Sequence, residues 1–173
     1  MEPLRAEAIA TARLDLVPLL VEHADEMATV LADSALHRFI GGAPADREAL
    51  RTRYRRLVAG PADPAVSWLN WVIRWRAAAC LTGTVQATVS PSATGPIAEV
   101  AWVVGTPWQQ RGIASEAAHG LVAWLCTQPV TEIVAHIDPQ HHASAGVATA
   151  AGLTPTDEWQ DGELRWRRPT AEL

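Results

Sequence analysis

The segment from residue 97 to residue 138 constrains the fold of this chain more than any other. Residues 97–104, IAEVAWVV, are apolar enough for a buried strand, and residues 115–126 have the apolar spacing of a helix. A second strand-like run, EIVAHID, follows at 132–138. Because a strand, a helix and a strand in this order form a right-handed crossover, we expect the two strands to be parallel or nearly so. The segment therefore predicts an α/β fold.

The rest of the chain adds antiparallel strands and helices to this unit. Alternating polarity predicts strands, apolar spacing near 3.6 residues predicts helices, and turns rich in glycine or proline separate them. The further predicted elements are a strand at 11–17, helices at 22–32 and 46–59 (the latter with Asp46 as its N-cap), a hairpin of 68–75 and 80–89, a helix at 141–153 that ends at Gly152, and a hairpin of 153–159 and 162–168 joined at Asp161-Gly162. We therefore expect a mixed sheet flanked by helices in a single domain, residues 1–173.

The composition limits the classes of function. The chain has 173 residues, of which 49% are hydrophobic, and this suits one globular domain with a sizeable core. The formal net charge of -5 argues against a nucleic-acid partner and favours a neutral or cationic one. All 14 basic residues are arginines, which excludes chemistry that needs a lysine, such as a Schiff base or a Walker phosphate loop.

The cysteines and the apolar runs predict a location. Cys80 and Cys126 lie far apart and lack the spacing of a metal or redox motif, which is typical of reduced thiols in a cytosolic protein. The first residues contain acids and no long apolar core, so we expect no signal peptide. No apolar run is long enough to cross a bilayer. We expect a cytoplasmic protein without a membrane partner, and a homodimer stays open.

The turn PWQQRGIASEA, residues 107–117, has the features of an anion site. A helix N-terminus exposes unpaired amide groups and a partial positive charge. Gly112 and Ala114 leave room for a ligand near these amides, and Arg111 adds a permanent charge, so phosphate is the expected guest. The Walker loop needs a lysine and the dinucleotide fingerprint needs three glycines, and this turn has neither. A third pattern, Gln/Arg-x-x-Gly-x-Gly/Ala, matches residues 109–114.

This third pattern resembles the pyrophosphate loop of the GNAT superfamily of N-acetyltransferases. Most of the chain is also similar to the RimJ/RimL-like branch of that superfamily, the ribosomal-protein-alanine acetyltransferase type. The matching segments are TARLDLVPLLVEHADEM, WVIRW with LTGTVQATV, AEVAWVVGTPWQQRGIASEA including Glu116, and IVAHIDPQHHASAGVATAAGL. The resemblance implies the GNAT fold, a mixed and mostly antiparallel sheet of about seven strands flanked by helices, with a V-shaped splay between the fourth and fifth strands.

The resemblance also implies the reaction and its ligands. Acetyl-CoA would be the acetyl donor, a primary amine on a small molecule or a protein N-terminus would be the acceptor, and no metal would take part. Backbone amides at a bulge from Trp102 to Val104 would act on the carbonyl oxygen, and His141 stands where the branch usually has an asparagine. The residues implied in acetyl-CoA binding are Trp102, Val103, Val104, Gln109, Gln110, Arg111, Gly112, Ile113, Ala114, Ser115, His141 and Ser144.

Direct transfer to an amine needs a proton acceptor for the amine and a proton donor for the thiolate. The resemblance points to Ser144 as the donor, because the tyrosine that many members use aligns with Ala148 here. For the base, Glu99 in the fourth strand, His136 in the fifth strand and water alone stay open as alternatives. Asp138, which shares a strand face with His136, could hold the substrate ammonium.

Two other functions compete with an enzyme of this kind. The departures at His141 and Ala148 are compatible with a catalytically silent acyl-CoA-binding regulatory module, which would bind acetyl-CoA and release no thiol to any amine. A general nucleotide-binding protein would bind ATP or NAD without a preference for CoA. The adjacent His141 and His142 would not face the same way on a helix and have no suitably spaced third ligand, so we expect no metal site.

Overall fold

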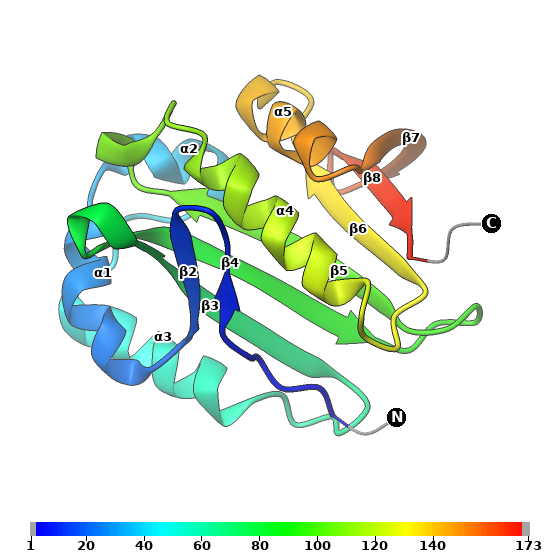
Figure 1. Ribbon diagram of the computed structural model, residues 1–173, viewed down its shortest axis with the longest axis horizontal. Helices are drawn as coiled ribbons and strands as arrows, with labels where there is room; N and C mark the ends of the chain where they lie inside the picture. Colours follow the sequence, from blue (N-terminus) through cyan, green and yellow to red (C-terminus); the bar gives the residue numbers. More distant parts are fainter. Residues whose placement is uncertain (1–2, 171–173) are drawn as a thin grey trace.

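The computed structural model describes residues 3–170, and one mixed sheet of eight strands runs through it (Figure 1). The strands lie in the order β1-β2-β3-β4-β5-β6-β8-β7. Their bounds are β1 (Ile9–Ala10), β2 (Leu14–Pro18), β3 (Ser67–Trp75), β4 (Cys80–Ser90), β5 (Ile97–Val104), β6 (Glu132–Ile137), β7 (Thr154–Gln160) and β8 (Glu163–Pro169). The helices are α1 (Ala24–Val30), α2 (His37–Ile40), α3 (Arg47–Ala59), α4 (Ile113–Leu125) and α5 (His142–Ala150), with short 3-10 turns at Val21–His23, Ser34–Leu36, Arg76–Ala78 and Thr106–Trp108.

Each helix and strand expected from the sequence is present. Asp46 caps α3 as predicted, because its Oδ1 accepts a hydrogen bond from the Ala49 amide at 2.8 Å. Gly152 follows α5 in the left-handed conformation, with φ 85°, and Asp161-Gly162 joins β7 to β8. The two-residue β1 and the short α2 were not expected, and the first long strand begins at Leu14 rather than at residue 11.

The two edges of β5 are paired to different extents. Its antiparallel ladder with β4 covers all of Ile97–Val104. Its parallel ladder with β6 covers only residues 97–99, which lie opposite 132–134. After Glu99 the two strands separate, as Figure 1 shows, and β6 pairs along its other edge with β8. The predicted mixed sheet and its V-shaped splay are thus confirmed.

The bulge lies one strand away from its expected place. The register between β4 and β5 runs without a shift through Trp102 to Val104, so the expectation of a bulge there is wrong. The shift occurs between β3 and β4 instead, and it makes Thr82 the extra residue. The separation of β5 from β6, rather than a bulge, therefore leaves backbone groups of β5 without a neighbouring strand.

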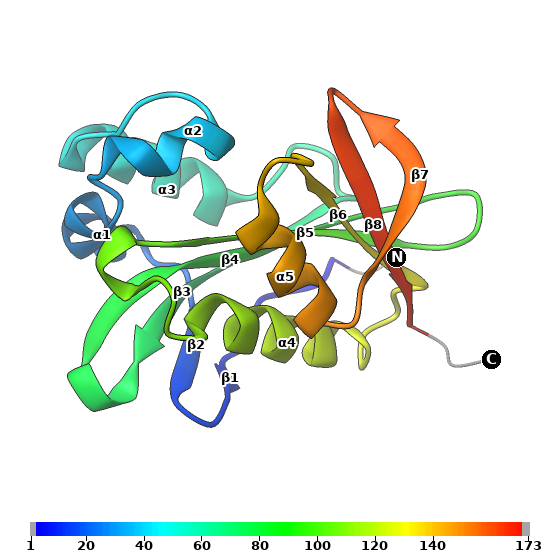
Figure 2. The ribbon, with the colours of Figure 1, turned by 90° about the horizontal axis from the view of Figure 1, so that it is seen from above.

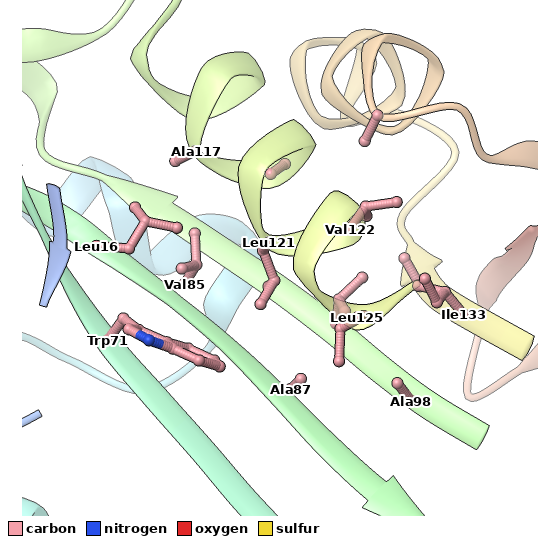
Figure 3. Packing of buried hydrophobic residues seen from close by; sticks show 14 of the residues in the cluster. Leu16, Trp71, Val85, Ala87, Ala98, Ala117, Leu121, Val122, Leu125 and Ile133 are labelled. Carbon is pink, nitrogen blue, oxygen red and sulfur yellow. The ribbon is translucent and has the colours of Figure 1, made fainter. Parts of the chain in front are cut away.

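Helices cover both faces of the sheet, with α4 and α5 on one face and α1, α2 and α3 on the other (Figure 2). The main core lies under α4, where Leu121 and Leu125 belong to one buried cluster with Trp71 of β3 (Figure 3). A smaller core packs α1 and α3 on the sheet through Met27 and Tyr54. Within residues 3–170, no helix has the length and apolar character needed to cross a membrane.

Apolar and polar side chains alternate along β4, and this explains why the two faces of the sheet differ in polarity. Successive side chains of a strand point to opposite faces. After the bulge, Val85, Ala87 and Val89 of β4 are buried in the main core under α4, and the polar side chains between them point the other way, toward α2 and α3. This polar set is Thr84, Gln86 and Thr88. The second face of the sheet therefore has a polar floor.

Candidate active site

An open cleft of about 660 Å³ lies at the splay between β5 and β6. Its floor is the polar face of the sheet, with Asn70 of β3 and Gln86 of β4. Its walls come from α2 and α3, and Ser144 of α5 also lines it. Because α5 covers the opposite face of the sheet from α2 and α3, the cleft passes through the splay from one face to the other.

His136 and Glu99 form a hydrogen-bonded pair where β5 and β6 begin to separate. Glu99 is the last residue of β5 that pairs with β6, and its partner there is Val134. His136 Nδ1 lies 2.8 Å from Glu99 Oε1, with the two side chains 11% and 53% exposed. A carboxylate can only accept, so in a neutral imidazole Nδ1 must carry the proton and donate it to Glu99. Nε2 is then left as an acceptor. That tautomer suits a general base.

The same end of the cleft is rich in carboxylates. Asp138, just after β6, and Glu163, the first residue of β8, both line the cleft. Burial raises the pKa of the Glu163 carboxyl. The negative charges of Asp138 and Glu99 raise this pKa further, whereas His136 lowers it. Within residues 3–170, no three acidic, histidine or cysteine side chains are grouped to hold a metal ion. The negative charge of these carboxylates suits an organic cation such as an ammonium group.

On the other side of the splay, α5 places Ser144 against β5. Trp102 Nε1 donates a hydrogen bond to Ser144 Oγ at 3.1 Å. Because an indole N–H can only donate, the hydroxyl proton of Ser144 stays free for another acceptor. Ala148, one turn further along α5, has 0% exposure and faces the core. Of these two positions, Ser144 alone can present a proton to the cleft.

Two aromatic rings meet at the wall of the cleft. Phe39 of α2 stacks on His141, with ring centroids 4.0 Å apart and planes 17° apart. His141 is the N-cap of α5, and its Nδ1 accepts a hydrogen bond from the Ser144 amide at 3.5 Å. Burial lowers the pKa of His141, although the charge of Asp138 acts in the opposite direction. The imidazole is therefore neutral at pH 7, as the N-cap bond requires.

The turn between β5 and α4 forms the expected open helix end. Gly112 is the N-cap of α4, with φ 74° and no side-chain cap, and Gln110 also has a positive φ of 58°. The first helical bond of α4 runs from the Glu116 amide to the Gly112 carbonyl at 3.0 Å. Within residues 3–170, the amides of 113–115 have no hydrogen-bond acceptor. These amides could bind an anion.

The side chains predicted to bind acetyl-CoA at this helix end differ in their exposure and their contacts. Arg111 is exposed, and its guanidinium carbon lies 5.7 Å from the centroid of the Trp75 ring. Gln109 turns back, and its Nε2 donates to the Val104 carbonyl at 3.0 Å. Val104 and Ile113 are 7% and 1% exposed, so these two could contact a ligand only through their backbone.

An ion pair fixes this helix end to the turn between β1 and β2. Glu116 accepts hydrogen bonds from Thr11 Oγ1 at 2.6 Å, from the Arg13 amide at 2.7 Å and from Arg13 Nε at 2.6 Å. Arg13 Nη1 in turn donates to the Arg111 carbonyl at 3.0 Å. Burial alone would raise the pKa of Glu116, but the hydrogen bonds from Thr11 and Arg13 outweigh it and hold this pKa below its usual value.

The residues singled out in the sequence fall into two groups, apart from Val104, which belongs to neither. The first group lines the cleft: Glu99, Trp102, Val103, His136, Asp138, His141 and Ser144. The second group, residues 109–115, forms the helix end and does not line the cleft. Among the cleft residues that the sequence alone did not single out are Phe39, Tyr54 and Glu163. Phe39 and Tyr54 are the only phenylalanine and tyrosine of the chain, but a lone aromatic on a helix is usually a core residue.

The fold, with an open helix end beside a splayed strand pair, agrees with the class of protein expected from the sequence, a GNAT acetyltransferase. The family model described as "Acetyltransferase (GNAT) domain" matches residues 13–154. The chain therefore belongs to the GNAT acetyltransferases, and the expectation of an enzyme that transfers acetyl groups is confirmed. No curated protein matches the chain in sequence.

Solved structures share the fold over nearly the whole chain. A GNAT acetyltransferase from Bacillus anthracis has a TM-score of 0.78 and 18% identity, covering 96% of this chain and 100% of its own. RimL, a ribosomal L7/L12 alpha-N-protein acetyltransferase solved with coenzyme A, has a TM-score of 0.78 and 16% identity, covering 94% and 98%. The microcin C7 self-immunity acetyltransferase MccE, solved with acetyl-CoA and AMP, has a TM-score of 0.73 and 13% identity, covering 91% and 93%. The likeness to RimL agrees with the RimJ/RimL-like branch expected from the motifs.

Proposed function

We propose that this cleft transfers acetyl from acetyl-CoA to a primary amine, with His136 as the general base and Glu99 as the residue that positions it. The observation that carries the proposal is the 2.8 Å contact between His136 Nδ1 and Glu99 Oε1 at the mouth of the splay. It supplies an oriented base in a cleft that also contains a hydroxyl with a free proton. The acceptor is a small-molecule amine or a protein N-terminus.

The donor side of the proposal uses the helix end and the splay. The pyrophosphate of acetyl-CoA would lie on the amides of 113–115, with Arg111 beside them. The thioester would lie in the splay near Trp102 and Ser144, which are joined at 3.1 Å. Backbone amides of β5 beyond Glu99 have no β6 partner, and they are the candidate donors to the carbonyl oxygen.

The acceptor side of the proposal uses the acidic end of the cleft. An alkyl ammonium has a pKa near 10 and must lose a proton before it can attack. Asp138 and Glu163 would hold the ammonium, and His136 Nε2 would take the proton. The amine nitrogen then bonds to the carbonyl carbon, the carbon–sulfur bond breaks, and the thiolate receives the Ser144 proton. The new amide nitrogen gives up its second proton, which restores Ser144 through water, and His136 releases its proton to the solvent.

The location and the partners belong to the same proposal. Cys80 and Cys126 are both free thiols, which supports a cytoplasmic protein that works with acetyl-CoA and an amine. Acetyl-CoA titrated by calorimetry should bind with micromolar affinity, while ATP and NAD as controls should not. Absence of acetyl-CoA binding would contradict the donor site.

Variants of the proposed base test the acceptor side. With amines assayed by thiol release, His136→Asn should lower kcat roughly 100-fold because no base remains at the amine. Glu99→Gln should lower kcat about tenfold, and neither variant should change the dissociation constant of acetyl-CoA more than about twofold. Glu22→Gln is the control, since Glu22 is exposed and outside the cleft. An unchanged kcat in His136→Asn would overturn His136 as the base and leave Glu99 or water as the proton acceptor.

Ser144→Ala separates binding from turnover on the donor side. The variant loses the proton offered to the thiolate, so kcat should fall about 10- to 100-fold. The affinity for acetyl-CoA should stay nearly constant, because the helix end and the backbone of β5 are untouched. Equal turnover in the variant and the parent would remove Ser144 from the mechanism.

A further inference from the structure

The charges that line the cleft are separated along its length. The end formed by β5, β6 and β8 contains three carboxylates, those of Glu99, Asp138 and Glu163. Arg53 of α3 lines the opposite end and is the only arginine among the cleft-lining residues of the described chain. Arg51, on the same helix, pairs with Asp25 at 2.7 Å, whereas Arg53 makes no ion pair within residues 3–170. The cleft thus has a negative end and a positive end.

Tyr54, next to Arg53, has a buried polar group without a partner. Its side chain lines the cleft, it is 3% exposed, and its hydroxyl has no hydrogen-bond partner within residues 3–170. Burial raises the pKa of Tyr54 to about 12, against the smaller opposing effect of the Arg53 charge, so the hydroxyl stays a donor. A buried donor of this kind is costly unless something accepts its hydrogen bond. The other side chains at this end are apolar, with Leu19, Leu50 and Leu57 among them.

The sheet sets the distance between the two ends. Tyr54 packs in one cluster with Val72 of β3, and His136 belongs to β6. In the sheet, β4 and β5 lie between these two strands. Paired strands are roughly 4.8 Å apart, and β5 and β6 lie further apart than this at His136, so the two ends are separated by at least about 14 Å. An extended peptide advances about 3.5 Å per residue, so about four residues bridge this distance.

We propose that Arg53 and Tyr54 form a subsite for a carboxylate of the acetyl acceptor, and that the acceptor is therefore a zwitterion with its amine at the acidic end. The inference rests on the proposed function, because that function places the reacting amine at His136. Neighbouring positions of a helix point in different directions, but the side chains of Arg53 and Tyr54 both line the cleft. The guanidinium and the phenol hydroxyl can therefore give one carboxylate a charge-assisted and a neutral hydrogen bond. Asn70 and Gln86 on the floor between the ends can pair with neutral polar groups in the middle of such an acceptor.

Direct binding tests this subsite without requiring turnover. Tetra-alanine with a free carboxyl group, and tetra-alanine amide, are titrated by calorimetry into the protein with and without CoA. The amide keeps the length and the ammonium but lacks the carboxylate. We expect the free acid to bind about tenfold more tightly, which is typical of a charge-assisted hydrogen bond. Equal affinities, or no binding of either peptide, overturn the subsite.

Substitutions in α3 show which residues cause the tighter binding of the free-acid peptide. Arg53→Ala should weaken binding of the free acid about tenfold and Tyr54→Phe about threefold, while binding of the amide stays the same. Arg55→Ala is the matched control, because Arg55 is exposed on the same helix and does not line the cleft. If Arg55→Ala reduces the preference as much as Arg53→Ala does, overall charge explains it and the subsite is overturned.

The same two peptides distinguish failure of this inference from failure of the proposed function. Thiol release from acetyl-CoA reports acetyl transfer, and the ratio of acid to amide affinity reports the subsite. Transfer to both peptides with equal kcat/KM supports the transferase and overturns the subsite. Tighter binding of the free acid, with no thiol release from any amine, supports the subsite and overturns the proposed function.

Discussion

Replacing Glu116 with glutamine tests how the helix end of α4 is held in place. The carboxylate accepts hydrogen bonds of 2.6, 2.7 and 2.6 Å from Thr11 and Arg13. Glutamine keeps the shape and one acceptor oxygen, but its NH2 group would meet Arg13 Nε–H as donor against donor. Arg13 then loses its fixed position, and so does the hydrogen bond from its Nη1 to the Arg111 carbonyl.

The loss of stability follows from these contacts. A hydrogen bond to a charged group contributes about 1.5–3 kcal/mol when shielded, and an exposed ion pair contributes about 0–1 kcal/mol. The Arg13 side chain is 44% exposed and the Glu116 side chain 18%, so this pair lies between the two limits. We expect Glu116→Gln to lower the free energy of unfolding by about 1–2 kcal/mol, a fall in Tm of roughly 2–8 °C for a chain of this length.

The charge of Glu116 makes this loss depend on pH. The folded state holds the pKa of Glu116 below its unfolded value. The contribution of the Glu116 charge to the free energy of unfolding is therefore complete above about pH 4.5 and is lost as the pH falls further. Glutamine does not titrate in this range. The difference in unfolding free energy between parent and variant should therefore be largest at neutral pH and should shrink below about pH 4. Urea unfolding at a series of pH values measures this difference.

A matched variant and one binding measurement complete the test. Glu48→Gln removes an exposed acid from the first turn of α3 and should change the free energy of unfolding by less than about 0.5 kcal/mol. The affinity of Glu116→Gln for acetyl-CoA should fall several-fold, because the turn that carries Arg111 is less firmly held. The reasoning is refuted if Glu116→Gln is as stable as the parent, or if the difference is the same at pH 4 and pH 7.

The remaining predictions concern the helix end and the N-cap of α5. Gly112→Trp should weaken acetyl-CoA binding by roughly 100-fold or more in calorimetry, because the side chain covers the helix amides. Gly60→Trp also puts a side chain at a positive φ, 84° at Gly60 against 74° at Gly112, and the ψ of 175° at Gly60 makes its strain at least as large, yet it should bind acetyl-CoA normally. Burial lowers the pKa of His141, so the folded state disfavours its protonation and the parent should gain stability as the pH rises through about 6.5. His141→Asn should lack this gain, and thermal unfolding between pH 5 and pH 8 checks the difference.

Local patterns predicted the parts of the fold that depend on neighbouring residues. The start of α3 follows from Asp46, the end of α5 from Gly152, and the last turn from Asp161-Gly162, since each acts within a few residues of the chain. The helix end at Gly112 was predictable for the same reason. These features needed no knowledge of the tertiary structure.

Contacts between distant segments set what the sequence could not predict. Residues 11–13 alternate in polarity like a strand, yet they form a turn because Thr11 and Arg13 bind Glu116, more than a hundred positions away. Tyr54 follows the apolar spacing of its helix and so resembles a core residue, although its side chain lines the cleft and its buried hydroxyl has no hydrogen-bond partner within residues 3–170. The stack of Phe39 on His141 joins a helix that the sequence did not reveal to one that it did. In each case the residue or cleft that determines the role of the side chain is formed by segments far away in the sequence.

The splay between β5 and β6 is the structural reason for proposing the cleft as the functional site. β6 pairs with β8 along all of Glu132–Ile137, so it remains part of the sheet although it leaves β5 after Glu99. β5 stays in the sheet through its full ladder with β4. The two facing edges then carry backbone N–H and C=O groups without strand partners, and such groups are stable only against water or a ligand. The pantetheine arm of CoA contains amide groups that could pair with such an edge, and this supports the proposal that the thioester lies between β5 and β6, beside His136 and Ser144.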